Sequence, residues 1–281
     1  MIDLHTHTTC SDGTDSPFAL VKKALATGVT TLAITDHDTT AGWSEAITAL
    51  QPQIELVLGA EISCLTTDGI SVHMLGLLFD GENAAIQQIL ADSRDTRIPR
   101  MRKMVELLKV DGIDISLDDV KAQTPEGATV GRPHLADALV HKGVVASRDE
   151  AFLNLLNNES KYYVTHAAPT PVEAIRAIRS AGGVAVIAHP FASRRGQIIT
   201  SETFADLVAA GLNGIEVHHR DQNADERKTL SDIAQELNLV ITGSSDYHGT
   251  GKLNAMAENT TLAAQWEALE AQADARRVVR V

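Results

Sequence analysis

The sequence contains few of the residues that mark several common classes of protein. Its 281 residues include only two cysteines, Cys10 and Cys64, so it can form neither a disulfide framework nor a cysteine-rich zinc ribbon. It has no run of about 18 apolar residues that could span a membrane, and its N-terminus, MIDLHTHTTC, lacks the basic and apolar regions of a signal peptide. We therefore expect a cytoplasmic protein without membrane contact.

Aromatic residues and positive charge are also scarce. Aromatics make up 4% of the chain, and 24 Lys and Arg against 37 Asp and Glu leave a net charge of −13. Proteins that bind long nucleic acid through its phosphates normally carry a basic surplus, so the composition argues against this class. The hydrophobic fraction of 44% is ordinary for a folded globular protein.

Short apolar segments alternate with helical patterns over much of the chain, which is typical of a parallel α/β sheet. The seven predicted strands span residues 2–5, 31–36, 54–61, 70–78, 183–188, 214–218 and 239–244. Ser16-Pro17 and Thr170-Pro171 each predict the start of a helix, and Gly28 and Gly182 predict where those helices end. Seven strands of this kind can close into an α/β barrel.

This alternation stops between about residues 80 and 165. Four helical segments are predicted there, at 83–96, 99–109, 134–142 and 148–157, with breaks at Pro99, Asp111-Gly112 and Gly131-Arg132-Pro133. We interpret residues 80–164 as an inserted helical subdomain that caps a barrel formed by residues 1–79 and 165–281.

Histidines and carboxylates gather where the predicted strands end, the place at which side chains of parallel α/β proteins converge. They are His5, His7, Asp12, His37, Glu61, His189, Asp246 and His248, with His73 inside the predicted strand at 70–78. Buried charges and imidazoles are costly without a partner, and this donor mixture favours Zn, Mn or Fe(II) over calcium. The sequence therefore predicts a site for more than one metal ion. We expect His219 to face solvent and leave His218 open between the site and solvent.

Five short motifs together resemble the PHP (polymerase and histidinol phosphatase) family over residues 1–79 and 165–250. They are His5-Thr6-His7-Thr8 with Ser11-Asp12-Gly13, Thr35-Asp36-His37-Asp38, Gly59-Ala60-Glu61-Ile62-Ser63, Ala188-His189-Pro190 and Ser245-Asp246-Tyr247-His248. The resemblance implies a distorted seven-stranded TIM-like barrel. It also implies two to three divalent ions, with Mn the first choice and Zn or Fe(II) as alternatives.

By this resemblance, each ion has its own set of ligands. The first ion would take His5, His7, Glu61 and Asp246; the second Glu61, His73 and His189; and the third Asp12, His37 and His248. Such ions lower the pKa of bound water and neutralise phosphoryl charge, which suits phosphoester hydrolysis. We expect hydroxide generated in this way to attack phosphorus. Glu61, Asp246 and His248 are the predicted catalytic residues, with Asp246 or His248 donating a proton to the leaving oxygen.

Basic residues are concentrated in the predicted insert. Residues 94–103 hold five cations, Arg94, Arg97, Arg100, Arg102 and Lys103, against one acid. If Pro99 starts a helix, Arg100 and Lys103 lie at its N-terminus, where a bound phosphate would offset the unfavourable helix dipole. The predicted substrate-binding residues are Arg100, Lys103, Arg132, His134 and Arg194, together with Asp12, His37 and His248 beside the ions.

Two phosphate sites favour a nucleoside 3′,5′-bisphosphate such as the adenosine compound, which would give AMP and phosphate. The segment Gly131-Arg132-Pro133-His134-Leu135-Ala136 and the basic helix also resemble the PHP branch that acts on such nucleotides and on short RNA ends. Alternatives are a 5′→3′ exoribonuclease on short 5′-phosphorylated RNA, a histidinol-phosphate phosphatase, and a non-catalytic PHP module. The sequence leaves the oligomeric state open.

Overall fold

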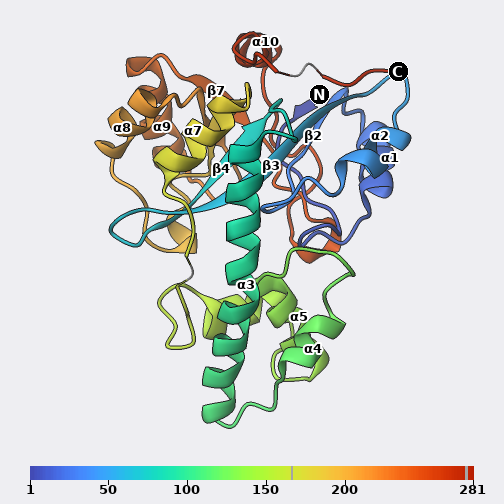
Figure 1. Cartoon of the computed structure of the whole chain (residues 1–281), viewed down its shortest axis with the longest axis vertical. Coiled ribbons are helices and arrows are strands. Elements are labelled where there is room, and N and C mark those ends of the chain that lie inside the picture. The colour runs from blue at the N-terminus through green and yellow to red at the C-terminus, as the bar shows by residue number, and fades with distance from the viewer. Residues whose placement is uncertain (166, 276–277) are drawn as a thin grey trace.

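The computed structural model of the protein describes residues 1–165, 167–275 and 278–281, and all seven predicted strands are present in it (Figure 1). They are β1 (Ile2–Asp3), β2 (Thr31–Ile34), β3 (Glu55–Leu65), β4 (Ser71–Leu77), β5 (Val184–Ala188), β6 (Gly214–His218) and β7 (Val240–Gly243), which form one sheet in this order. A parallel bridge between Thr6 and Tyr247, beyond the ends of β1 and β7, brings the two edges together. The predicted seven-stranded α/β barrel is therefore confirmed.

One strand does not run in the predicted direction. β4 is antiparallel to both β3 and β5, whereas the other neighbouring strands are parallel. The connection from β3 to β4 comprises only residues 66–70, and Thr66 N donates to Ile70 O at 2.9 Å within it. A parallel crossover needs about a dozen residues, so this short turn requires the antiparallel arrangement.

Helices cover the outside of the barrel. They are α1 (Pro17–Thr27), α2 (Trp43–Thr48), α7 (Pro171–Ser180), α8 (Thr203–Ala210), α9 (Ala224–Glu236) and α10 (Ala263–Glu270). The predicted start of α1 is confirmed, because the Ser16 side chain accepts a hydrogen bond from Ala19 N. Gly28 ends this helix in the left-handed conformation, with φ of 87°.

The segment after β4 is helical, as predicted, but its helices differ from those expected. They are α3 (Ala84–Val110), α4 (Leu117–Ala122), α5 (Arg132–His141) and α6 (Arg148–Ala151), the last continued by a π-helical turn over Phe152–Leu156. Pro99 lies inside α3, so the two helices predicted at 83–96 and 99–109 are one helix of 27 residues. α4 was not predicted.

The two halves of α3 are anchored in different cores, which explains why Pro99 does not end the helix. Ile86 and Leu90 pack in the core beneath the sheet, whereas Met101 and Met104 pack in a separate core formed with the following helices. Proline removes one helical hydrogen bond, and burial of apolar side chains on both sides offsets that loss. Since α3 crosses between the two cores, the boundaries at 80 and 164 remain our proposal for the insert.

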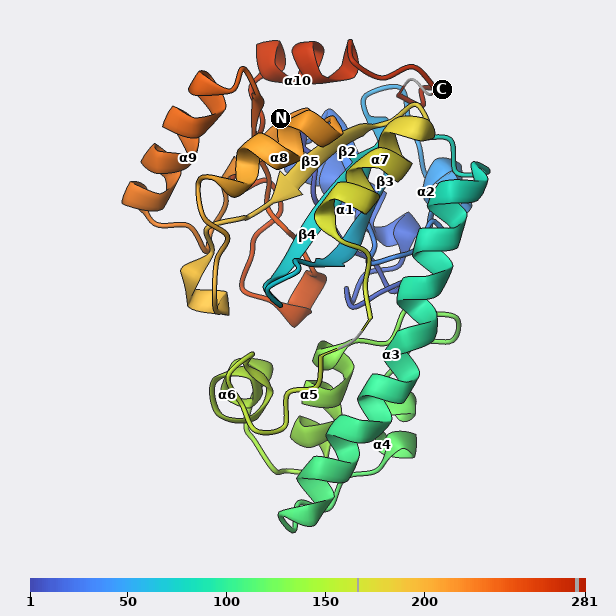
Figure 2. The same cartoon turned by 60° about the vertical axis from the view of Figure 1, so that its left-hand side comes forward.

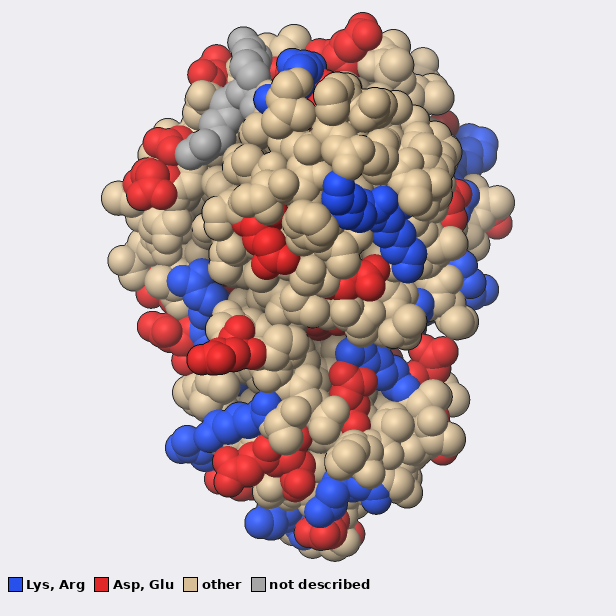
Figure 3. All heavy atoms as spheres, turned by 90° about the vertical axis from the view of Figure 1, so that its right-hand side faces the viewer, with Lys and Arg blue, Asp and Glu red and all other residues tan. Residues whose placement is uncertain are grey.

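The insert lies on one side of the barrel, below it in Figures 1 and 2, where the short helices Ser193–Arg195 and Gly249–Gly251 also lie. Figure 3 shows acidic and basic side chains interspersed over one face of the barrel and of the insert. Among the helices of the described residues, none has the length and apolar character needed to cross a membrane.

Candidate metal centre

Glu61 lies at the centre of the predicted histidine cluster. It sits on β3 and is 1% exposed. Its Oε2 lies 3.2 Å from His5 Nε2, 3.1 Å from His7 Nε2 and 3.1 Å from His37 Nδ1, and its Oε1 lies 2.7 Å from His73 Nδ1 and 3.3 Å from His189 Nε2. One carboxylate therefore faces five imidazoles, an arrangement suited to a ligand shared between cations.

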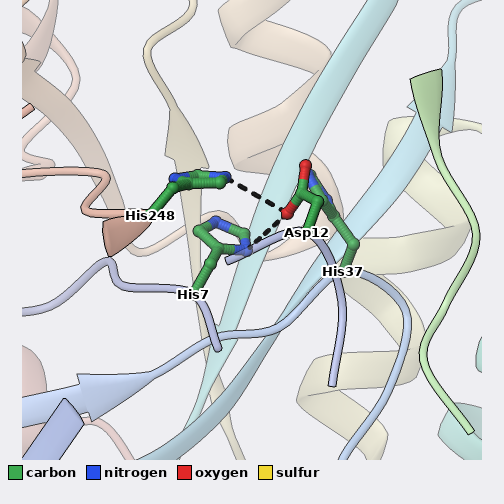
Figure 4. A group of neighbouring side chains, drawn as sticks. All are labelled: His7, Asp12, His37 and His248. Atoms are coloured by element: carbon green, nitrogen blue, oxygen red, sulfur yellow. Dashed lines mark ion pairs between the residues drawn. The ribbon is translucent and has the colours of Figure 1, made fainter. Parts of the chain in front are cut away.

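Among the described residues, the structure brings together four groups of potential ligands, and within each group the ligand atoms lie within 4.8 Å of one another. They are His5, His7, Glu61 and Asp246; His7, Asp12, His37 and His248; His37, Glu61 and His73; and His5, His189 and Glu216. The first equals the set predicted for one ion, and the second contains the predicted third set with His7 added (Figure 4). The members of the predicted second set meet at Glu61 Oε1, which lies near His73 and His189.

Several buried atoms in this region are suited to bind cations. Asp12 Oδ1, His37 Nδ1 and His248 Nε2 are buried and form no hydrogen bond among the described residues, although His248 Nε2 lies 3.2 Å from Asp12 Oδ1 and His37 Nδ1 lies 3.1 Å from Glu61 Oε2. All three belong to one of the four groups. Buried polar atoms are nearly always partnered, so a bound ion explains the set. Carboxylate and imidazole donors fit Mn, Zn or Fe(II).

The protonation states also indicate a site built for positive charge. Burial alone would lower the pKa of His7, but Asp246 and Glu61 outweigh it and raise that pKa to about 9. The same balance raises the pKa of His5 well above its usual range. Burial would raise the pKa of Glu61, but the surrounding imidazoles hold it well below its usual range. Protons on the imidazoles thus balance carboxylates that metal ions would otherwise neutralise.

Binding of Mn²⁺ should therefore release protons. The pKa of His7 is about 9, so His7 carries a proton at neutral pH and must lose it to coordinate an ion. We expect release of about one to two protons per protein at pH 7, and an apparent Mn²⁺ affinity that rises with pH until His7 is neutral. Calorimetric titrations in two buffers of different ionisation enthalpy measure this number. An enthalpy that does not depend on the buffer would contradict the prediction.

Glu216, a buried glutamate on β6, was not predicted as a site residue. Its Oε1 lies 3.1 Å from His5 Nδ1, and its Oε2 accepts a hydrogen bond from His189 N at 3.0 Å. Glu216 therefore orients the two predicted ligands His5 and His189 through these contacts, as carboxylates often do at metal-binding histidines. A charged residue within the apolar strand Gly214–His218 was the available signal.

His219 was predicted to face solvent, and this prediction was wrong. His219 is fully buried, and its Nε2 lies 3.3 Å from Asp246 Oδ2, whereas His218 is exposed. Its Nδ1 accepts a hydrogen bond from Asp221 N at 3.0 Å, so the proton is on Nε2 and is donated to Asp246. The pairing of β6 with β7 is irregular between Glu216 and His218, so strand alternation cannot be extended to these residues.

Asp246 and His248 fit ion ligands better than the proton donor that we expected one of them to be. Burial would raise the pKa of Asp246, but Lys252 and neighbouring imidazoles hold it well below its usual range. Asp246 Oδ2 accepts from Arg195 Nη2 at 2.8 Å and from Lys252 Nζ at 2.9 Å. Burial lowers the pKa of His248 to about 4, with Lys252 contributing. The former is thus an anion and the latter a neutral imidazole near pH 7.

Two partly buried arginines of the insert lie beside one aromatic ring. The guanidinium of Arg100 is 5.2 Å and that of Arg132 is 5.3 Å from the centre of the Tyr163 ring. Arg100 Nε donates to Val164 O at 2.6 Å, and Arg132 Nη1 donates to Asn158 Oδ1 at 2.7 Å. Burial, and then the charge of Arg132, lowers the pKa of Arg100 to about 10. Neither guanidinium forms an ion pair with a carboxylate within the described part of the chain.

Arg100 was expected at a helix N-terminus, but it lies inside α3. Lys103 and Arg194 are exposed, and the neighbouring Arg195 contacts the histidine cluster instead, with Nη1 3.1 Å from His189 Nε2. His134 is buried at the start of α5, where its Nδ1 accepts a hydrogen bond from Gly131 N at 3.0 Å.

Comparison with known proteins agrees with this geometry. The family model of the PHP domain matches residues 3–165, more than half of the chain. The chain belongs to the PHP family. This PHP protein superimposes with a TM-score of 0.92 on a putative metal-dependent phosphoesterase from Bifidobacterium adolescentis, 41% identical, with 97% of this chain and 96% of that one covered. Family and site together make it a metal-dependent phosphoesterase.

Two curated relatives carry different activity names. A 5′-3′ exoribonuclease from Haemophilus influenzae is 36% identical, with 88% of this chain and 89% of the relative covered. A 3′,5′-nucleoside bisphosphate phosphatase from Chromobacterium violaceum is 32% identical, with 89% and 88% covered. Both names describe reactions at phosphate esters of nucleotides.

Proposed function

We propose that this PHP protein hydrolyses the 3′-phosphate of nucleoside 3′,5′-bisphosphates and releases the 5′-monophosphate and phosphate. The observation that carries this proposal is the pair Arg100 and Arg132, two partly buried guanidiniums without a carboxylate partner among the described residues. Charges that are partly withdrawn from water favour a partner of opposite sign, and arginine forks match phosphate oxygens. The activity named for the C. violaceum relative supports the same substrate class.

In this proposal the substrate spans the space between insert and barrel. Arg100 and Arg132 hold the 5′-phosphate, and the 3′-phosphate lies at the cluster around Glu61. Asn158 and Arg195 connect the two regions, because Asn158 accepts from Arg132 Nη1 at 2.7 Å and donates to Arg195 O at 3.2 Å, while the Arg195 guanidinium bonds to Asp246. Two to three divalent ions, Mn in our proposal, supply the activated water and neutralise phosphoryl charge when bound.

Arg132→Ala should raise the KM for a 3′,5′-bisphosphate by about 10- to 100-fold, because a charge-assisted hydrogen bond contributes about 1.5–3 kcal/mol. Turnover of a small phosphomonoester with a single phosphate should change little, because it never contacts the insert. Phosphate-release kinetics on both substrates measure the difference. Arg102→Ala is the matched control, since Arg102 is exposed on the same helix as Arg100. An unchanged KM for the bisphosphate would exclude this phosphate site.

The second candidate is a 5′→3′ exoribonuclease, the activity named for the H. influenzae relative. Arg100 and Arg132 would then hold the 5′-phosphate of a short RNA, and the bond cleaved would be the next phosphodiester. A panel of 3′,5′-bisphosphate, 5′-monophosphate, histidinol phosphate and short 5′-phosphorylated RNA separates the candidates. Preferred cleavage of RNA would replace the first proposal, and preferred hydrolysis of histidinol phosphate would exclude both.

A further inference from the structure

The insert holds the loop that carries Asp12 at two backbone oxygens. Thr129 N donates to Cys10 O at 2.9 Å, and Arg148 Nη1 donates to Asp12 O at 3.4 Å. Both donors belong to the insert, and both acceptors belong to the loop after β1. The backbone position of Asp12 therefore depends on the insert.

Arg148 also reaches the loop that carries His248. Its Nη1 lies 3.3 Å from Gly251 O, and Gly251 N donates to His248 O at 3.3 Å. Its Nε and Nη2 bond to the two carboxylate oxygens of Asp137 on α5. This guanidinium is thus fixed within the insert by a bidentate pair and directs its remaining nitrogen to two ligand-bearing loops of the barrel.

A second arginine fixes the loop that carries His37. Arg97 of α3 forms a buried ion pair with Asp38, the residue after His37, and its Nη1 donates to Val130 O at 3.1 Å. The loops of Asp12, His37 and His248 are therefore all held from the insert. Glu61 and His73, in contrast, lie on strands of the sheet itself.

We infer that the insert is a structural part of the ion site formed by His7, Asp12, His37 and His248, with Arg148 as its positioning residue. This site holds its ion only while the insert keeps the loops in place, whereas the group His37, Glu61 and His73 takes two of its three ligands from strands and depends on the insert less. By linkage, an anion that orders the insert strengthens ion binding at this site, and the ion strengthens binding of the anion. The inference concerns ion binding and does not depend on which phosphoester is cleaved.

Titration of the ion-free protein with Mn²⁺, followed by calorimetry and elemental analysis, tests this. Arg148→Gln should weaken one class of site by about 10- to 100-fold, the range for residues that orient ligands, and affect the others less. Asp12→Asn removes a ligand of the same set and should affect the same class of site. Arg102→Gln, at an exposed position of α3, should titrate like the wild type.

Gly251→Ala provides a second variant that leaves Arg148 unaltered. A Cβ at this position would lie 2.2 Å from Arg148 Nη1, so the guanidinium must move away from the loop. We expect the same class of site to weaken by a smaller factor, which keeps the test valid if Arg148→Gln does not fold. A folded variant of either kind with wild-type Mn²⁺ affinity at every site overturns the inference, as does an Asp12→Asn protein that loses no site. If the protein does not hydrolyse the proposed substrate, only the phosphate-release panel would show it.

Discussion

Replacement of Glu61 with glutamine is expected to lower kcat/KM by about 10³-fold and to remove Mn²⁺ from the purified protein. Ions held by Glu61 would contribute several kcal/mol to stabilising the charge of the transition state, and about 1.4 kcal/mol corresponds to a tenfold change in rate. Both oxygens of Glu61 face imidazole nitrogens, so an amide keeps the shape but loses the charge. Its NH₂ group would also point at nitrogens that ions should bind.

The measurement combines steady-state kinetics with elemental analysis of the same preparation. Glu106→Gln is the matched control, because Glu106 is exposed on α3, on the insert side of Pro99. It should keep the metal content and the rate of the wild type. Glu61→Gln protein with full metal content and normal turnover would show that the carboxylate does not hold the ions.

The positions of the strands could be predicted from sequence because each is a short apolar segment between turn signals. The direction of β4 could not be deduced from that pattern, which is the same for parallel and antiparallel strands. The length of the preceding connection, residues 66–70, does contain this information. Pro99 misled the prediction because local propensity ends a helix there, while tertiary burial on both sides keeps α3 continuous.

The histidine cluster was predictable because strand ends of a barrel converge whatever the details of the loops. Which of two adjacent loop residues points into the site was not, since no periodicity relates their direction to the sheet. Arg195 instead of Arg194 reaches Asp246, and His219 instead of His218 enters the site. In both cases adjacent residues differ only in local backbone geometry, which composition and spacing do not report.

Asp246→Asn should be nearly as damaging as the change at Glu61, with kcat/KM lowered by about 10²- to 10³-fold and loss of bound Mn²⁺. Asp246 Oδ1 lies 3.4 Å from both His5 Nε2 and His7 Nε2, on the side where an ion would bind. Its other oxygen accepts from Arg195 and Lys252, so the neutral amide also leaves two cations without their shared counter-charge.

The contribution of ion binding can be separated from that of Arg195 with Asp221→Asn. Asp221 Oδ2 accepts from Arg195 Nε at 2.6 Å but belongs to none of the four groups of potential ligands. The Asp221→Asn protein should therefore keep its Mn²⁺ content. Its kcat/KM should fall by less than about tenfold, the effect of one partly exposed ion pair. Equal losses in the two variants would mean that Asp246 acts by holding Arg195. A loss of Mn²⁺ confined to Asp246→Asn would instead identify its carboxylate as a ligand, with Arg195 and Lys252 keeping that carboxylate ionised.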